Sequence, residues 1–281
     1  MSPRRLRLDA ELVRRGLARS RDHAAELIAD GRVTVSGARA TKPATAVSTD
    51  VALVVEADPA IPGGEEYVSR GGHKLAGALA AFGPQGLRVS GRRCLDAGAS
   101  TGGFTDVLLR HGARQVVAVD VGYGQLAWKI RQDERVVVLD RTNVRDLDLG
   151  TVGEPVDVVV GDLSFISLRL VLGPLVSVTA PDGDLALMVK PQFEVGRERV
   201  GKGGVVRDLA LRVEAVEDVA AAAAELGWGA RAVTVSPLPG PSGNVEFFLW
   251  LRQGPATIGH DVIEAVVSAG PAGVPGEKVD P

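Results

Sequence analysis

Two charged residues end apolar, strand-like runs in the middle of this chain. Asp162 closes the run VDVVVGD, and Lys190 closes the run DLALMVK. In an open sheet of parallel strands the ligand lies at the carboxyl ends of the strands, so both side chains are expected to face one ligand. A lysine whose pKa is lowered by burial or by a neighbouring cation can remove a proton from a hydroxyl group. The simpler alternatives are a helix cap for Asp162 and an ordinary strand-end charge for Lys190.

A glycine-rich turn precedes these runs in the segment LDAGASTGGF. Its spacing, G-x-x-x-G-G, is neither the dinucleotide fingerprint nor a P-loop. Asp120 ends the run QVVAVD, where an acid can bind ribose hydroxyls, and Asn143 follows RVVVLD, where it can reach an adenine edge. A tight strand–helix connection is the alternative for the turn alone, but the combination favours a nucleoside ligand, and S-adenosylmethionine over NAD. The residues assigned to this cofactor are Asp96, Gly98, Ala99, Ser100, Thr101, Gly102, Gly103, Asp120, Asn143 and Asp162.

The residue types narrow the methyl acceptor to a hydroxyl group. Enzymes that methylate amino groups usually carry an Asp/Asn-Pro-Pro-aromatic tetrad where this chain has DLSF, residues 162–165. Methylation of pyrimidine carbon 5 needs a cysteine nucleophile. The single cysteine, Cys94, begins a strand-like run and is read as a small buried residue.

A second lysine occupies an unusual place in the segment 69–83, SRGGHKLAGALAAFG. The spacing predicts a helix with Leu75, Leu79 and Phe82 on one face and Lys74 near its start. A lysine there opposes the helix dipole, which indicates a functional demand. Glu246 lies in the apolar run NVEFFLWL, where alternation predicts that it faces solvent.

The elements fall into an N-terminal domain at 1–58, a linker at 59–70, a catalytic domain at 71–253 and a tail at 254–281. The first domain is expected to hold two helices, at 8–16 and, after a Ser20 cap, up to Gly31, then a hairpin turning at Ser36-Gly37 and a strand at 50–56. Alternating strands and helices predict a parallel, doubly wound sheet in the catalytic domain. ARAVTVS and NVEFFLWL should pair antiparallel, because PLPGPSG between them is too short for a crossover helix. The tail is expected to form a short helix at best.

Composition excludes several classes of protein. Among 281 residues, 45% are hydrophobic, and one cysteine excludes a disulfide scaffold, a four-cysteine zinc site and an iron–sulfur cluster; no metal site is predicted. No run of about 18 apolar residues could span a membrane, and the basic N-terminus meets Asp9 and Glu11 where a signal peptide is apolar. The sequence thus predicts a soluble, cytoplasmic protein.

The N-terminal segment is basic. Residues 1–42 carry ten Lys/Arg against five Asp/Glu, which favours contact with a polyanion; a solvated basic helix face is the alternative.

The chain resembles two known families. Its N-terminal segment RLDAELVRRGLARSRDHAAELIADGRVTVSG is similar to the S4 RNA-binding domain. Over roughly residues 4–252 it resembles the TlyA family, also known under the name hemolysin, in the motifs SRGGHKL, DAGASTGGFTD, DVGYGQL, DLSFISL, VKPQFEVG and PLPGPSGNVEFFLWL. In the linker the chain departs from close relatives, which carry a tryptophan where it has Tyr67.

This resemblance implies an S-adenosylmethionine-dependent ribose 2′-O-methyltransferase of ribosomal RNA. The implied fold is an S4-like α+β domain followed by a Rossmann-like, FtsJ/RrmJ-like α/β domain with a mostly parallel seven-stranded sheet. The longer N-terminal form resembles the actinobacterial type, which acts on cytidines of both ribosomal subunits, in 16S and 23S rRNA. The family's catalytic tetrad falls on Lys74, Asp162, Lys190 and Glu246. Lys190 would be the base or the oxyanion stabiliser, Asp162 and Lys74 would orient the ribose, and Glu246 would hold a lysine.

The implied partner is ribosomal RNA, alone or in ribosomal subunits. The S4-like module would bind its backbone through Arg4, Arg5, Arg14, Arg15, Arg19 and Arg21. Phe165 and Phe193 would stack a flipped nucleotide. Two other classes of protein stay open. A membrane-active cytolysin would be expected to carry a signal peptide or an apolar segment, and this sequence shows neither. A non-catalytic RNA-binding protein would not need Lys74, Asp162 and Lys190 together.

Overall fold

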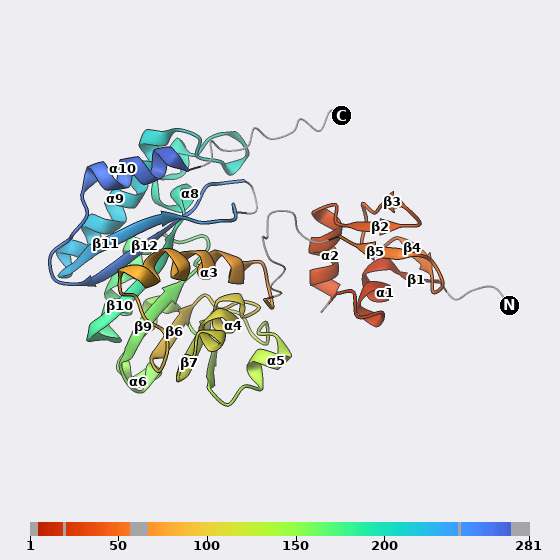
Figure 1. Cartoon of the computed structure of the whole chain (residues 1–281), viewed down its shortest axis with the longest axis horizontal. Helices are drawn as coiled ribbons and strands as arrows, with labels where there is room; N and C mark the ends of the chain where they lie inside the picture. The colour runs from red at the N-terminus through yellow and green to blue at the C-terminus, as the bar shows by residue number, and fades with distance from the viewer. Residues whose placement is uncertain (1–4, 19–20, 57–66, 241–242, 271–281) are drawn as a thin grey trace. The chain divides into compact units, whose positions relative to one another are not determined.

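The computed structural model describes residues 5–18, 21–56, 67–240 and 243–270, and the chain divides into two units, residues 1–65 and 66–281 (Figure 1). Each unit is described by itself. Among the described residues, no helix is both long enough and apolar enough to cross a membrane.

The first unit contains two helices, α1 (Leu8–Arg14) and α2 (Arg21–Ala29), and two small sheets. One sheet pairs β1 with β4, and the other has the order β3-β2-β5. The bounds of these strands are β1 Arg5–Arg7, β2 Val33–Val35, β3 Ala38–Arg39, β4 Ala46–Ser48 and β5 Leu53–Val55. Both central residues of the predicted hairpin turn have positive φ, +50° at Ser36 and +83° at Gly37, as a two-residue hairpin requires. The proposed cap at Ser20 lies outside the described residues, and β1 and β4 were not expected.

The second unit is built on a seven-stranded sheet of order β11-β12-β10-β9-β6-β7-β8. Its strands are β6 Arg93–Ala97, β7 Gln115–Asp120, β8 Val136–Asp140, β9 Val156–Gly161, β10 Thr179–Val189, β11 Trp228–Val235 and β12 Phe247–Gln253. Only β12 runs antiparallel to its neighbours, β10 and β11. The predicted fold class, a mostly parallel seven-stranded α/β sheet, is confirmed, and so is the antiparallel terminal pair.

Helices connect and cover these strands. The α-helices are α3 Gly71–Phe82, α4 Gly103–Arg110, α5 Trp128–Arg131, α6 Leu149–Val152, α7 Leu172–Ser177, α8 Pro191–Glu194, α9 Leu209–Glu225 and α10 His260–Ala269. Short 3-10 helices are η1 Gly83–Gln85, η2 Val144–Asp146, η3 Leu168–Leu170, η4 Arg197–Arg199 and η5 Lys202–Gly204. α10 is the short helix expected in the tail.

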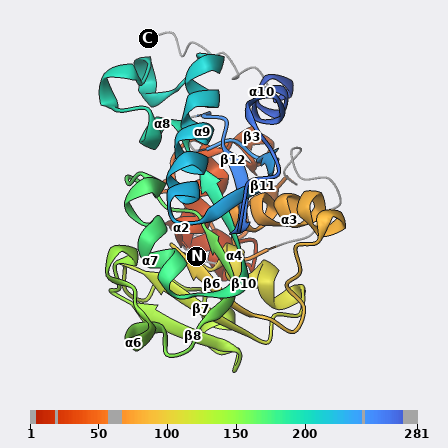
Figure 2. The same cartoon turned by 90° about the vertical axis from the view of Figure 1, so that its left-hand side faces the viewer.

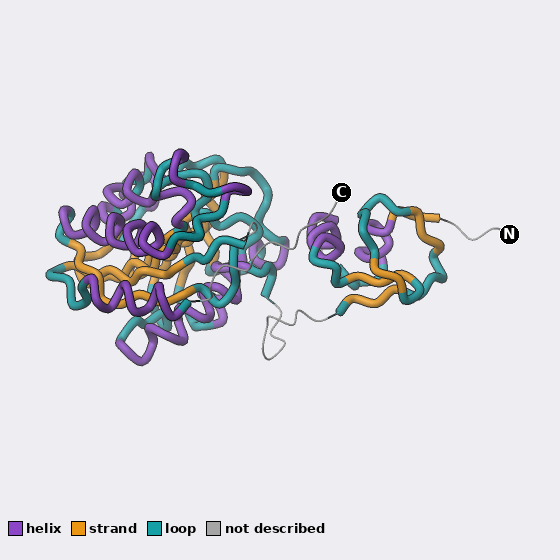
Figure 3. The backbone as a smooth tube through the Cα atoms, turned by 90° about the horizontal axis from the view of Figure 1, so that it is seen from above, coloured by secondary structure: helices purple, strands orange, loops and turns teal. Residues whose placement is uncertain are grey.

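The sheet has an apolar layer on each face because strand side chains alternate in direction. On β6, for example, Cys94 packs with α3 and α4, whereas Leu95 and Ala97 pack with α7 and α9. Figure 2 places α3 and α4 on one side of the sheet and α7 and α9 on the other, and Figure 3 shows the same sandwich along another axis. With both faces covered, the carboxyl edge of the parallel strands is where loops can form a site.

Candidate active site

Lys190 follows β10 directly and joins the loop that follows β9. Its Nζ lies 2.6 Å from Oδ1 of Asp162 and 3.0 Å from Oγ of Ser164. The lysine side chain is buried, whereas that of Asp162 is about one-fifth exposed. The structure therefore brings these two predicted residues together as an ion pair open to a ligand on the carboxylate side. Ser164 was not singled out from the sequence, because its role depends on a partner in the next strand.

Lys74 forms a second buried ion pair, with Glu246. Its Nζ lies 2.6 Å from Oε2 of Glu246 and 4.0 Å from the sulfur of Met188. Glu246 precedes β12 and is only 1% exposed, so the expectation from alternation that it faces solvent is wrong. The carboxylate compensates the unfavourable position of Lys74 in the first turn of α3, while Oε1 of Glu246 has no hydrogen-bond partner among the described residues. Both members of this pair are thus held at the sheet edge despite the cost of burial.

The register of the sheet places both ion pairs at one edge. Val189 of β10 pairs with Phe247 of the antiparallel β12, so the next residues outward, Lys190 and Glu246, lie at the same edge. Four residues that are far apart in sequence therefore meet at the end of three neighbouring strands.

Two phenylalanines lie beside this edge. The rings of Phe165 and Phe193 are 5.4 Å apart, and Nζ of Lys190 lies 5.9 Å from the Phe193 ring. Phe165 is 92% exposed and has a φ of +64°, so it is not part of the core. Both rings line a cavity of about 520 Å³ whose other walls include Gln192 and Arg197. An aromatic pair with one exposed ring, next to a buried lysine, can stack a planar group.

The glycine turn lies directly against the Asp162 loop. Gly102 has a φ of +95°, and a Cβ there would come within 2.8 Å of the side chain of Leu126. A Cβ on Gly98 would lie 3.0 Å from the carbonyl oxygen of Asp162. The turn therefore needs glycine for its backbone conformation and for close packing inside the protein, in addition to any ligand.

Asp120 holds the turn from the neighbouring strand. Its carboxylate accepts hydrogen bonds from the backbone N–H of Ser100 (2.8 Å) and of Gly122 (2.7 Å). Ser100 itself has a positive φ of +46°. A partly exposed carboxylate thus lies at the end of β7, beside the turn, and its binding of ribose hydroxyls stays a prediction.

Asp96 is a fully buried carboxyl at the end of β6, beneath the turn. Its Oδ2 accepts a hydrogen bond from the hydroxyl of Thr105 (2.7 Å), and its Oδ1 has no partner in the described part of the chain. Burial raises the pKa of Asp96 from 3.8 to about 7, and the nearby Asp162 and Asp120 raise it further, against the hydrogen bond from Thr105. A free acceptor atom in this position can receive a cationic donor.

Asn143 follows β8, and Trp128 lies between β7 and β8. Asn143 is exposed and caps its own turn, with its Oδ1 accepting from the N–H of Arg145 at 3.1 Å. Trp128 begins α5 and is 74% exposed; in the same segment Leu126 and Ile130 flank Gly102. The structure leaves the Asn143 side chain accessible but does not place it against the turn.

The predicted linker ends inside the second unit. Tyr67 and Val68 are buried, and the N–H of Val68 donates to Oδ2 of Asp106 in α4 (2.9 Å). A Cβ on Gly103, the first residue of α4, would lie 2.2 Å from Oγ of Ser69. This segment is therefore packed against the helix that follows the glycine turn.

Four of the six predicted RNA-contacting arginines lie in described residues. Arg5, Arg14 and Arg21 are exposed, while Arg15 is partly buried. Arg4 and Arg19 lie outside the described residues. Arg15 pairs with Glu11 at 2.6 Å and donates to the backbone oxygens of Val51 (2.6 Å) and Thr49 (2.9 Å). Arg15 therefore also has a structural task, which the sequence did not reveal.

Cys94 is buried in β6, and burial raises the pKa of its thiol to about 12, which keeps it protonated. It is not a nucleophile in this site. Within the described ranges, no group of three or more His, Cys, Asp and Glu side chains could hold a metal ion.

Comparisons with known proteins agree with this architecture. Residues 67–253 match the FtsJ-like methyltransferase family, and residues 6–52 match the S4 domain. The chain is 61% identical to the 16S/23S rRNA (cytidine-2′-O)-methyltransferase TlyA of Mycobacterium tuberculosis, over 89% of this chain and 90% of that protein. It is 44% identical to YqxC of Bacillus subtilis, named as an rRNA methyltransferase, over 90% of this chain and 87% of that protein.

A solved structure extends the likeness to the fold of both units. A Streptococcus thermophilus protein named as a hemolysin is 36% identical, with a TM-score of 0.74 over 95% of this chain and 96% of that one. The match thus covers both the S4 unit and the unit built on the seven-stranded sheet. The chain belongs to the FtsJ-like methyltransferases and, within them, to the TlyA family.

Proposed function

We propose that this chain transfers a methyl group from S-adenosylmethionine to the ribose 2′-hydroxyl of cytidine in ribosomal RNA, in the cytoplasm. The observation that carries this proposal is the pair of ion pairs, Lys190–Asp162 and Lys74–Glu246, held beside a glycine turn at one sheet edge. The relative with 61% identity is named for this reaction on 16S and 23S rRNA.

The residues around the turn fit S-adenosylmethionine. The partnerless Oδ1 of Asp96 suits an ammonium group, and the carboxylate of Asp120 at the end of β7 suits ribose hydroxyls. The exposed side chain of Asn143 would bind the edge of the cofactor's adenine. The bound cofactor supplies a methyl group on a positively charged sulfur.

The ion pairs hold and deprotonate the acceptor hydroxyl. In contact with Asp162, Lys190 is an ammonium group, which donates hydrogen bonds but has no lone pair to accept a proton. It therefore stabilises the oxygen as negative charge develops, and the hydroxyl proton passes to the carboxylate of Asp162. Lys74, fixed by Glu246, orients the ribose. Most of the acceleration comes from alignment of the hydroxyl with the methyl group.

Recognition of RNA divides between the two units. In the first, the exposed Arg5, Arg14 and Arg21, with Arg4, Arg15 and Arg19, supply positive charge to the phosphate backbone. In the second, the exposed ring of Phe165 with Phe193 stacks the flipped base.

Mapping of 2′-O-methyl groups tests the function. Ribosomal RNA from cells that lack this gene should lose methylation at specific cytidines, and the purified full chain with S-adenosylmethionine should restore it on ribosomal subunits from those cells. Unchanged methylation together with lysis of erythrocytes by the pure protein would support the cytolysin alternative instead. Binding of RNA without any methyl transfer would support the non-catalytic one.

Binding of the cofactor should release a proton from Asp96. At pH 6 the carboxyl, with a pKa of about 7, is mostly protonated, and a cationic partner favours its ionised form. At this pH the amino group of the free cofactor is already protonated. Calorimetry in two buffers of different ionisation enthalpy should therefore detect release of nearly one proton per cofactor at pH 6, as a difference between the binding heats in the two buffers. Asp96→Asn should abolish this difference; equal release in that variant would assign the proton to another group.

The same shift has a consequence for stability. The folded protein keeps a proton on Asp96 that the unfolded chain has already released above pH 3.8. The free energy of unfolding of the cofactor-free protein therefore falls as pH rises from about 4 to about 7, and Asp96→Asn removes this contribution.

A further inference from the structure

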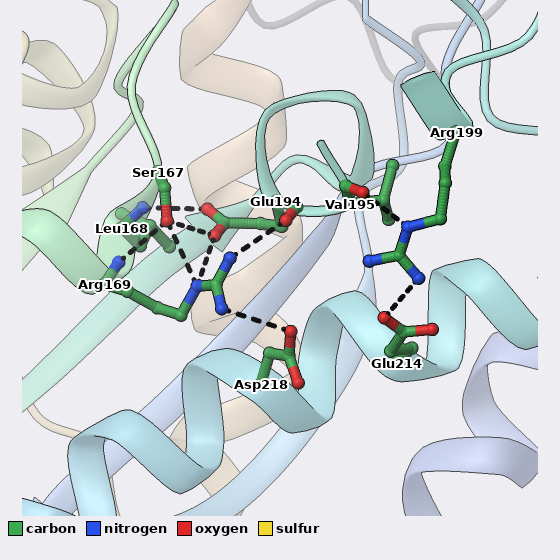
Figure 4. A network of polar contacts seen from close by, with 8 residues as sticks. All are labelled: Ser167, Leu168, Arg169, Glu194, Val195, Arg199, Glu214 and Asp218. Carbon is green, nitrogen blue, oxygen red and sulfur yellow. Dashed lines mark hydrogen bonds and ion pairs between the residues drawn. The ribbon is translucent and has the colours of Figure 1, made fainter. Parts of the chain in front are cut away.

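We propose that Glu194 is a positioning residue for the methyl transfer, which locks the loop carrying Asp162, Ser164 and Phe165 onto the strand end that carries Lys190. The inference rests on the proposed function. Figure 4 shows the network: Glu194 in α8, Ser167 and Leu168 of the β9 loop, and Arg169, which reaches Asp218 of α9.

Both oxygens of the Glu194 carboxylate bind the neighbouring loop. Oε2 accepts from the hydroxyl of Ser167 at 2.5 Å, and Oε1 accepts from the backbone N–H of Leu168 at 2.8 Å. Glu194 lies four residues after Lys190, and Ser167 lies five residues after Asp162. The carboxylate therefore joins the two segments only four and five residues after Lys190 and Asp162.

Arg169 completes the link from the outside. Its guanidinium donates to the backbone oxygen of Glu194 at 3.0 Å and to Oδ2 of Asp218 at 3.3 Å, and its Nε lies 3.6 Å from Oε2 of Glu194. The β9 loop is thereby tied to α9, the long helix that covers this face of the sheet.

The carboxylate is kept at a cost. Glu194 is 3% exposed, and burial raises the pKa of its carboxyl, although Ser167, Leu168 and Arg169 favour the charged form. An apolar side chain in this place would avoid the cost of burying a charged group, but it could not hold the N–H of Leu168. The carboxylate therefore serves to fix the position of the loop that follows β9.

The loop between Asp162 and Leu168 needs such an anchor because it contains a strained residue. Phe165 has a φ of +64°, which is unfavourable for a side chain with a Cβ and persists only where both flanks are fixed. One flank is fixed by the N–H of Asp162, which donates to the oxygen of Ala97 at 3.1 Å. The other flank is fixed by Glu194. Release of Glu194 lets Phe165 relax and moves Asp162 and Ser164 relative to Lys190.

The test compares Glu194→Ala and Glu194→Gln in the full chain, in single-turnover methylation of ribosomal subunits. Glu194→Ala should lower the rate at saturating substrates by about 30- to 100-fold, since a shift of about 1 Å costs that much, while cofactor and RNA dissociation constants stay within about twofold. Glu194→Gln should stay within about threefold of the parent, because an amide oxygen can accept from Leu168 and an amide N–H can donate to Ser167. The matched control is Glu214→Ala, which removes the exposed Arg199–Glu214 pair (2.5 Å) in the same network and should leave the rate unchanged.

Several outcomes decide the proposal. The proposal is overturned if Glu194→Ala methylates at the rate of the parent. It is also overturned if the affinity for the cofactor falls by the same factor as the rate. If Glu194→Ala does not fold, Ser167→Ala is the second variant: it removes the hydroxyl that donates to Glu194 and accepts from the backbone N–H and Nε of Arg169, but it leaves the bond between Glu194 and Leu168. It should still lower the rate about threefold to tenfold with binding intact; a parental rate there overturns the proposal too. A parent that transfers no methyl group contradicts the proposed function itself and is recognised before any variant is compared.

Discussion

Replacement of Lys190 by alanine is expected to lower turnover by about 10²- to 10⁴-fold, the range usual for loss of a group that handles a proton or a developing charge. The side chain lies 2.6 Å from Asp162 and 3.0 Å from Ser164, at the edge where the acceptor must bind. Dissociation constants for cofactor and ribosomal subunits should change little, because the interaction forms mainly in the transition state. Single-turnover rates and equilibrium binding measure the two effects separately. Substantial activity in the alanine variant would contradict the site assignment.

The arginine variant at the same position separates two roles. Arginine keeps the positive charge next to Asp162 but cannot act as a base near neutral pH. Because the ion pair argues for stabilisation of the alkoxide, Lys190→Arg should retain clearly more activity than Lys190→Ala. Equal inactivity of the two variants would favour a role for lysine as the base.

Substitution of Gly102 by valine should reduce cofactor affinity at least about 100-fold. A side chain at a φ of +95° costs about 1–2 kcal/mol, and crowding against Leu126, which a Cβ would approach to 2.8 Å, typically adds 1–3 kcal/mol. Relief of that crowding displaces the turn between Gly98 and Ser100. Titration calorimetry with S-adenosylmethionine measures the loss.

The matched control for this variant is Gly153→Val. Gly153 has a similar φ of +88° with open space around it, and it precedes β9 at the opposite end of the sheet. This variant carries the backbone cost without the crowding and should bind the cofactor like the parent. Equal losses in both variants would assign the effect to general destabilisation.

The sequence predicted those parts of the site that follow from strand ends. Asp162 and Lys190 were found because a parallel sheet brings the ends of its strands to one edge, and the structure joins them. For Glu246 the resemblance identified a role that alternation argued against. The expectation of solvent exposure failed because both faces of the sheet are covered. Glu246 alternates in step with Phe248 and Trp250 toward the face that α3 covers, where it meets Lys74.

Other features could not be predicted because they depend on contacts between distant segments. Glu194 binds residues 26 and 27 positions away, and the tasks of Arg15 lie 34 and 36 positions away. The strands β1 and β4 have three residues each, too few to give a periodic pattern. Such features follow from the packed chain and leave no local signal in composition or spacing.

The placement of tryptophan gives this protein an intrinsic optical probe. Of its three tryptophans, Trp228 and Trp250 are buried, and Trp128 is 74% exposed in the segment whose Leu126 and Ile130 flank Gly102. Water-exposed indole emits at longer wavelength than buried indole, so red-edge emission comes mainly from Trp128. A ligand that orders the glycine turn shifts this emission, and cofactor binding can be followed in the native chain without a dye or a label.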